Sequence, residues 1–133
     1  MIYPQSAVIP YRVKKKGMEV LLVTSSSGRR WVAPKGLVES GMTAWDSAAK
    51  EALEEAGVLG KVSKELLGSY RYEKWGGQCE VEVYAMRVTE ELSEWDEDDR
   101  DRAWYSPEEA ADLVKEKALS KMILRFASER VAS

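Results

Sequence analysis

Histidine is absent from this chain of 133 residues, and cysteine occurs once, at Cys79. A lone cysteine excludes a disulfide framework, and the lack of histidine argues against a zinc site or a His-based catalytic triad. Long apolar runs are also missing. None approaches the ~18 residues that a membrane span requires, and the first residues show no basic start followed by an apolar stretch. We therefore expect a cytoplasmic protein that does not enter a membrane.

The remaining composition is that of an ordinary globular protein. Hydrophobic residues make up 44% of the chain and charged residues 32%, which argues against disorder. A chain of this length can bury a core without disulfides or metals to hold it. We predict that residues 1–133 form a single domain.

Charge is distributed unevenly along the chain. The segment 1–38 contains seven Lys and Arg side chains and one acid, whereas 90–101 contains eight acids and one base, and the net charge is −3. A basic N-terminal part favours an anionic partner. Nucleic acid is not expected as that partner, because the overall balance is acidic and no basic stripe is interleaved with aromatic residues.

The pattern of apolar and turn-forming residues predicts a mixture of strands and helices. Strands are expected at 6–13, 18–24, 31–33, 61–72, 78–88 and 103–105, and helices at 43–56, from 106 onward and at 119–130. The segment 35–42 contains two glycines and is predicted to be a loop. This order of elements indicates an α+β fold.

The helix predicted at 43–56 contains a cluster of acids. Thr43 is placed to cap its start and Gly57 to end it. At 100° per residue, the three carboxylates of Glu51, Glu54 and Glu55 share one arc. The expected buried face consists of Trp45, Ala49, Ala52, Leu53 and Ala56.

Such a cluster requires compensation. Like charges four residues apart repel each other, and anions near a helix C-terminus oppose its dipole. Lys50 offers partial compensation, and a hard cation such as Mg²⁺, which prefers oxygen ligands, would offer more. The helix alone leaves a second interpretation open, namely a solvated acidic face.

The residues around this helix follow a long pattern with fixed spacing. Gly36 begins it, and the run Lys50-Glu51-Ala52-Leu53-Glu54-Glu55-Ala56-Gly57-Val58 ends it. The pattern resembles the Nudix signature, in which a glycine, five residues, a glutamate and seven residues precede Arg-Glu-aliphatic-x-Glu-Glu-x-Gly-aliphatic. Two positions depart from it: Met42 replaces the glutamate, and Lys50 replaces the arginine.

The resemblance covers about residues 6–117 and extends beyond the signature. Segments such as Arg30-Trp31-Val32-Ala33-Pro34 and Leu67-Gly68-Ser69-Tyr70 look like the branch of diphosphoinositol polyphosphate phosphohydrolases and diadenosine polyphosphate hydrolases. The resemblance implies the Nudix fold, a mixed β-sheet sandwiched between α-helices with a loop–helix–loop catalytic motif.

The activity implied by the resemblance is pyrophosphohydrolysis with Mg²⁺ or Mn²⁺. The substrate would be a nucleoside diphosphate derivative, a dinucleotide polyphosphate or an inositol pyrophosphate. Segment 73–79 is rich in bases in the inositol-phosphate branch but not in this chain, so a nucleoside derivative is at least as well supported. A homodimer is one option for the oligomeric state.

The resemblance also assigns roles to residues. Glu51, Glu54 and Glu55 would bind the metal, and Gly36 would let the loop backbone approach the substrate. Glu54 or Glu55 would also help to activate water. Lys50 would hold a glutamate in position, more loosely than arginine because it lacks the bidentate guanidinium. Glu39 and Glu97 are candidate accessory carboxylates.

The candidate substrate contacts are bases and hydroxyls near the N-terminal hairpin and the signature glycine. They are Arg12, Ser25, Ser26, Arg29, Arg30 and Lys35. For each base, a solvated surface position is the alternative interpretation.

Met42 supports a different function. A thioether is a poor ligand for Mg²⁺ and a weak hydrogen-bond acceptor. The alternative is therefore a catalytically weak Nudix-fold binding module for a nucleotide or phosphorylated ligand. A third option is a structural domain that binds a partner through its acidic segment.

Overall fold

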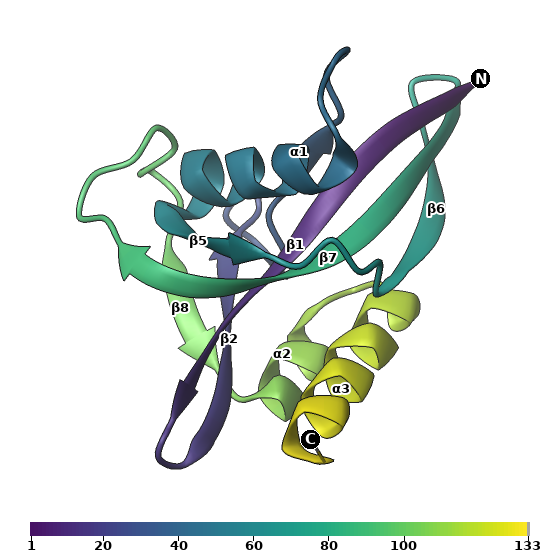
Figure 1. Ribbon diagram of the computed structural model, residues 1–133. Coiled ribbons are helices and arrows are strands. Elements are labelled where there is room, and N and C mark those ends of the chain that lie inside the picture. The colour runs from purple at the N-terminus through teal and green to yellow at the C-terminus, as the bar shows by residue number, and fades with distance from the viewer. Residues whose placement is uncertain (133) are drawn as a thin grey trace.

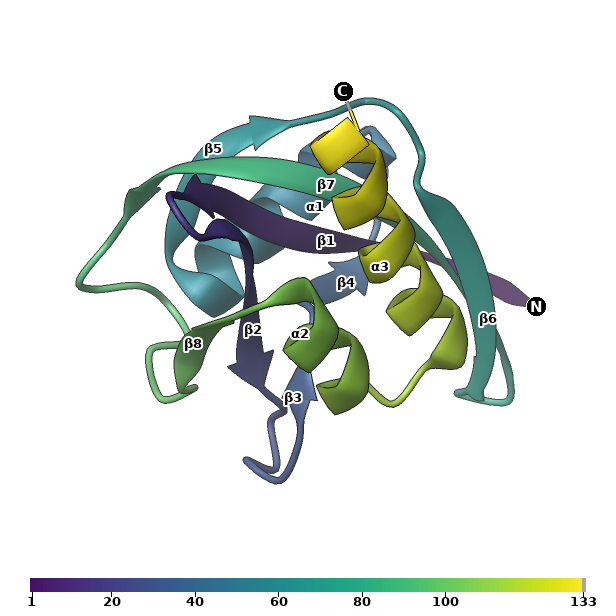
Figure 2. The same cartoon turned by 90° about the horizontal axis from the view of Figure 1, so that it is seen from below.

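The computed structural model describes residues 1–132 and shows a twisted sheet with helices on both faces (Figures 1 and 2). Helix α1 (Ala44–Glu51), continued by the π-helical turn η1 (Ala52–Ala56), covers one face. Helices α2 (Pro107–Leu113) and α3 (Lys117–Ala132) cover the other. Within residues 1–132, no helix is both long and apolar enough to cross a bilayer.

The sheet is mixed, and its longest strands lie at its centre. Its strands are β1 (Ile2–Lys14), β2 (Gly17–Thr24), β3 (Trp31–Val32), β4 (Lys35–Leu37), β5 (Val58–Val62), β6 (Gly68–Lys74), β7 (Gly77–Glu91) and β8 (Arg102–Tyr105). The order is β3-β2-β1-β7-β5, while β4 also pairs with β1, β6 with β7, and β8 with β2. The β1–β7 pair is parallel and the other pairs are antiparallel. The α+β architecture expected from the sequence is confirmed.

Alternation along the central strands produces two apolar cores, because successive side chains of a strand point to opposite faces. On β1, Ala7 and Ile9 pack toward α2 and α3, whereas Val8 packs toward α1. On β2, Leu22 faces the first group and Leu21 the second. The helix that bears the acids is therefore fixed against the sheet by its small residues Ala48, Ala52 and Ala56.

Several predicted boundaries were wrong. The segment 35–42 is not entirely loop, since β4 pairs with β1 from Gln5 to Ala7. The strand predicted at 61–72 is two strands, β5 and β6, which pair with different parts of β7. In both cases backbone pairing with a long central strand overrides the local composition.

The acidic helix begins and ends as predicted. The Thr43 side chain accepts a hydrogen bond from the Asp46 N–H, 3.1 Å away, and Gly57 has a left-handed φ of 65°. The π-helical turn between them was not predicted. A π-helical turn contains more residues than an α-helical one, so it changes which side chains face the core. Leu53, expected to be buried, is 37% exposed, whereas Glu51 and Glu55 are buried.

Candidate active site

Two carboxylates lie buried where α1 joins η1. Glu51 and Glu55 expose only 8% and 7% of their surface. The Lys35 backbone N–H donates to Glu55 Oε1 at 3.3 Å. A Cβ built on Gly36 would lie 2.4 Å from Glu51 Oε1. Strand β4 thus passes directly against both carboxylates, and the absence of a side chain at Gly36 makes room for Glu51.

The two carboxyl groups perturb each other. Burial, together with the adjacent Glu51, raises the pKa of Glu55 to about 8. Burial also raises the pKa of Glu51, although its hydrogen bond with Glu55 opposes the rise. Two buried carboxylates this close are costly to ionise together, so without a cation the pair retains a proton near neutral pH.

The third signature carboxylate, Glu54, is turned toward Lys50. The Lys50 ammonium lies 3.0 Å from Glu54 Oε1 and 2.9 Å from Glu39 Oε1. Lys50 therefore joins the loop before the helix to η1. These are the contacts expected if Lys50 positions a glutamate, and they orient Glu39 toward Lys50.

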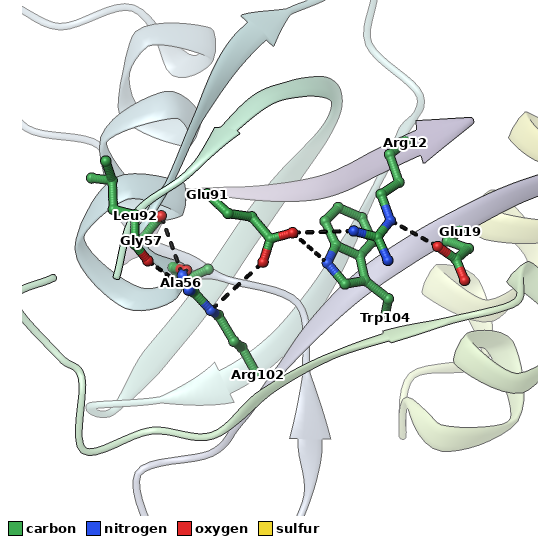
Figure 3. Close-up of polar contacts among 8 residues, drawn as sticks. All are labelled: Arg12, Glu19, Ala56, Gly57, Glu91, Leu92, Arg102 and Trp104. Atoms are coloured by element: carbon green, nitrogen blue, oxygen red, sulfur yellow. Dashed lines mark hydrogen bonds and ion pairs between the residues drawn. The ribbon is translucent and has the colours of Figure 1, made fainter. Parts of the chain in front are cut away.

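The C-terminal end of η1 is held by the segment after β7. Trp95 Nε1 donates to the Glu55 carbonyl at 3.1 Å, and the Glu97 N–H donates to the Glu54 carbonyl at 3.0 Å. Arg102 donates to the carbonyls of Ala56 at 2.7 Å and of Gly57 at 3.3 Å (Figure 3). The predicted accessory residue Glu97 is thus brought next to the helix, and its negative charge raises the pKa of both buried glutamates.

A cavity of about 480 Å³ opens beside Glu55. Its wall contains five Lys and Arg side chains, two serines and an aromatic ring. The lining residues are Ser25, Ser26, Arg30, Val32, Ala33, Lys35, Glu55, Tyr72, Lys74, Arg100, Lys115 and Glu116. The excess of positive charge favours an anionic ligand.

Within this wall, Lys35 occupies a special environment. Its ammonium lies 4.3 Å from the centre of the Tyr72 ring, and the Tyr72 hydroxyl donates to the Gln5 side chain at 2.7 Å. Burial lowers the pKa of Lys35, partly offset by the negative charge of Glu116. A half-buried ammonium of this kind would bind a ligand anion strongly, because little water screens it.

The structure brings some of the predicted substrate residues to the cavity and not others. Ser25, Ser26, Arg30 and Lys35 line it, whereas Arg12 and Arg29 are not among the lining residues. Arg12 is instead held between two acids, with Nε 2.7 Å from Glu19 and Nη1 3.1 Å from Glu91 (Figure 3). Its guanidinium also stacks 4.0 Å from the Trp104 ring centre.

Other lining residues were not identified from the sequence as ligand contacts. Tyr72 and Lys74 lie two residues apart on β6 and so share a face of that strand, a spacing that was visible in the sequence. Arg100 reaches the cavity from the acidic segment, held by Glu97 at 2.9 Å and by the Thr24 carbonyl at 2.8 Å. Nothing local marks Lys115 or Glu116, because the packing of α2 against α3 brings their connection to the cavity.

The donor set fits a hard cation in part. Mg²⁺ commonly uses one or two carboxylates together with waters and substrate phosphates, and Glu51 and Glu55 supply two such groups. Among residues 1–132, no cluster of three or more acidic, His or Cys side chains converges as a complete metal cage. Glu51 and Glu55 are therefore the described residues that would hold such a cation, with water or substrate as its other ligands.

Comparison with known proteins identifies the family. Residues 3–126 match the NUDIX domain. The chain is 31% identical to Nudix hydrolase 13, mitochondrial, of Arabidopsis thaliana, over 91% of this chain and 71% of the relative. It is 33% identical to diphosphoinositol polyphosphate phosphohydrolase 3-beta of Bos taurus, over 84% of this chain and 68% of the relative. The chain belongs to the Nudix family of hydrolases, and it is an enzyme of that family.

Two further comparisons bear on length and fold. Nudix hydrolase 16, mitochondrial, of Arabidopsis thaliana is 39% identical over 75% of this chain, but the chain spans only 60% of that relative. The crystal structure of a C. elegans Ap4A hydrolase binary complex superposes with a TM-score of 0.77 at 20% identity, covering 98% of this chain and 99% of that one. The likeness confirms the Nudix fold expected from the signature.

Proposed function

We propose that the protein hydrolyses a diphosphate linkage in a small-molecule phosphoanhydride, with Mg²⁺ or Mn²⁺ as cofactor. One observation carries the proposal: the buried pair of Glu51 and Glu55 adjoins a cavity whose wall holds five Lys and Arg side chains. The carboxylates suit a divalent cation and the bases suit phosphate, so the two halves of a metal–pyrophosphate complex have adjacent receptors.

The residues divide the work as follows. A bound divalent cation would neutralise phosphate oxygens and lower the pKa of a water ligand. Glu51 and Glu55 would hold that cation in place of their shared proton. Arg30 and Lys35, which line the same cavity as Glu55, would hold the phosphates. Because Glu54 is engaged with Lys50 while Glu55 faces the cavity, we favour Glu55 as the group that orients the attacking water.

The substrate class is inferred from the cavity and the relatives. A nucleoside diphosphate derivative or dinucleotide polyphosphate fits a wall with five bases and the single aromatic residue Tyr72. Inositol pyrophosphates remain among the substrates to be tested, because a relative is named for such a substrate.

The test is product analysis across these substrates with Mg²⁺ or Mn²⁺, using Glu55→Gln as the control. Gln has nearly the same size and cannot ionise, so the variant should fold. Turnover by the natural chain that is lost in Glu55→Gln would support the proposal. Full activity in both Glu54→Gln and Glu55→Gln would overturn the assignment of roles.

A binding module for a nucleotide or phosphorylated ligand is the second candidate. It is favoured by Met42 and by the presence of only two converging carboxylates in the described part of the chain. Saturable binding of a nonhydrolysed nucleotide, with no turnover at saturating Mn²⁺, would establish it.

Three properties of the whole protein belong to the proposal as well. We expect residues 1–133 to unfold as one cooperative domain, the protein to act in the cytosol, and a homodimer to be one option in solution. Calorimetry, fractionation and light scattering test these in turn. Names of several relatives include the word mitochondrial, so fractionation should include that organelle.

A further inference from the structure

The segment that follows β7 grips the last turn of the carboxylate helix by its carbonyl oxygens. Trp95 Nε1 donates to the carbonyl of Glu55 itself at 3.1 Å. Arg102 Nη1 donates to the next carbonyl, that of Ala56, at 2.7 Å, and reaches that of Gly57 at 3.3 Å. Arg102 Nη2 donates to the Leu92 carbonyl at 2.5 Å, so one guanidinium joins the helix end to the returning chain (Figure 3).

These bonds compensate for a weakness of the local structure. The last carbonyls of any helix lack partners within the helix. A π-helix is rare and occurs mostly as a single turn within an α-helix, often at a functional site. In η1 the turn presents Glu55, so its stability decides where that carboxylate points. Donors aimed at the carbonyls of Glu55 and Ala56 fix the backbone from which the Glu55 side chain extends.

The two donors form one packed unit. The Arg102 guanidinium lies 4.0 Å from the centre of the Trp95 ring. This stack is pressed against Gly57, where an added Cβ would lie 2.7 Å from the indole. Arg102 Nε also lies 4.0 Å from Glu91 Oε2, and Glu91 in turn binds Arg12 and Trp104 (Figure 3). The side chain of Arg102 is only 18% exposed. Neither Trp95 nor Arg102 lines the cavity.

We propose that Trp95 and Arg102 are positioning residues, which hold the π-helical turn so that Glu55 faces Glu51 and the cavity. The proposal rests on the proposed function in that Glu55 is treated as a metal ligand. Trp95 and Arg102 act through the backbone, without touching substrate. Loss of either donor loosens the carboxylate and weakens binding of a divalent cation.

The first test compares two tryptophan variants. Trp95→Phe retains an aromatic ring but removes the N–H that bonds Glu55. Trp104→Phe is the matched control, because it removes an N–H that bonds the Glu91 side chain at 2.9 Å and makes no bond to η1. Calorimetric titration of metal-free protein with Mn²⁺ should show affinity weakened about tenfold in Trp95→Phe, the lower end of the range for supporting residues around metal sites. The affinity of Trp104→Phe should change less than about twofold.

Arg102→Lys provides a second variant. Lys keeps the charge but cannot form the fork that binds several carbonyls at once. It should also weaken Mn²⁺ binding, and in both variants saturating Mn²⁺ should restore most of kcat while the metal concentration for half activity rises. A purely structural role would instead lower the unfolding midpoint and leave Mn²⁺ affinity unchanged, and that result would overturn the proposal.

Hydrogen exchange separates this inference from the proposed function. The Gly57 N–H donates to the Leu53 carbonyl at 3.1 Å within the gripped turn. Its exchange should accelerate in Trp95→Phe and not in Trp104→Phe, with or without metal. If the natural chain binds no Mn²⁺ and hydrolyses nothing, the proposed function fails. The exchange rate of the Gly57 N–H still reports whether Trp95 stabilises the turn. Equal exchange in both variants overturns the positioning role even where hydrolysis is intact.

Discussion

The backbone of Gly36 and the carboxylate of Glu51 share a space that one methyl group would fill: a Cβ at position 36 would lie 2.4 Å from Oε1 and 2.6 Å from Oε2 of Glu51. The sequence interpretation gave this glycine a role toward the substrate. In the structure its lack of a side chain makes room for the Glu51 carboxylate. The glycine that begins the Nudix signature and the first glutamate of its helix are therefore one steric unit here.

This relationship predicts the effect of Gly36→Ala. The methyl group must displace the Glu51 carboxylate, at an overpacking cost of about 1–3 kcal/mol, and metal-dependent activity should fall at least about tenfold. Urea unfolding and initial rates measure the two effects. In the double variant Gly36→Ala/Glu51→Ala the space is restored, so stability should recover relative to additivity while activity stays lost. Strictly additive losses of stability would contradict the steric account.

The carboxylate pair predicts a pH dependence of stability in metal-free protein. The unfolded chain releases the Glu55 proton near pH 4.5, whereas burial keeps it bound in the folded state up to about pH 8. Between these values the folded state binds more protons, so the free energy of unfolding falls as the pH rises, by an amount on the order of a few kcal/mol. Urea unfolding at several pH values between about 5 and 8 measures this slope.

The matched variant is Glu55→Gln, which is neutral throughout and should lose most of the slope. Mg²⁺ should raise stability most at the alkaline end of the range, because it replaces the proton that the pair has lost there. Parallel profiles for the natural chain and Glu55→Gln would show that the pair does not hold the proton.

Lys35 predicts a contribution to anion binding. Lys35→Met removes the half-buried ammonium beside Tyr72 while retaining an unbranched apolar stem. Binding of inorganic pyrophosphate, followed by calorimetry, should weaken about tenfold or more, because a buried charged hydrogen bond contributes about 1.5–3 kcal/mol. Lys15→Met, in the exposed turn between β1 and β2, is the control and should bind normally. Equal weakening in both variants would indicate long-range charge alone.

Lys50 predicts a difference between a replacement that keeps its charge and one that removes it. Lys50→Arg should retain contacts to both Glu39 and Glu54, whereas Lys50→Met releases the two carboxylates. We expect activity to stay within a few-fold of the natural chain in Lys50→Arg and to drop about tenfold in Lys50→Met, in line with residues that orient metal ligands. Initial rates at several Mn²⁺ concentrations measure this. Indistinguishable rates for the two variants would remove Lys50 from the site.

Much of the site could be predicted from the sequence because its residues lie on one helix with readable ends. Thr43 and Gly57 mark that helix by local hydrogen bonding and left-handed backbone, effects that depend on few residues. The π-helical turn could not be read in the same way. Its carbonyls bond Trp95 and Arg102, forty or more positions further along the chain, and its residues reverse the expected burial of Leu53 and Glu55.

The cavity wall shows a similar division. Ser25, Ser26, Arg30 and Lys35 line the cavity, and they were predicted because the family resemblance places the serine loop and the residue before the signature glycine beside the substrate. Arg12 lies in the same basic segment, but Glu19 and Glu91 neutralise it away from the cavity. Glu91 lies in β7, and only the fold reveals that β7 ends beside Arg12. Composition thus indicates an anionic ligand. Which basic residues face the cavity and which form ion pairs with acids depends on the tertiary structure.

The parallel pairing of β1 with β7 sets an order in which the protein can be completed during synthesis. Residue 2 pairs with residue 78 and residue 11 with residue 87. Strand β1 therefore cannot pair with β7, its longest partner, until most of the chain has been synthesised. Pairings of this range form slowly and leave apolar strand edges open meanwhile. The residues for chemistry are translated in the first half of the chain. With the positioning role proposed for Trp95 and Arg102, Glu55 reaches its working position only after both of these residues have emerged from the ribosome.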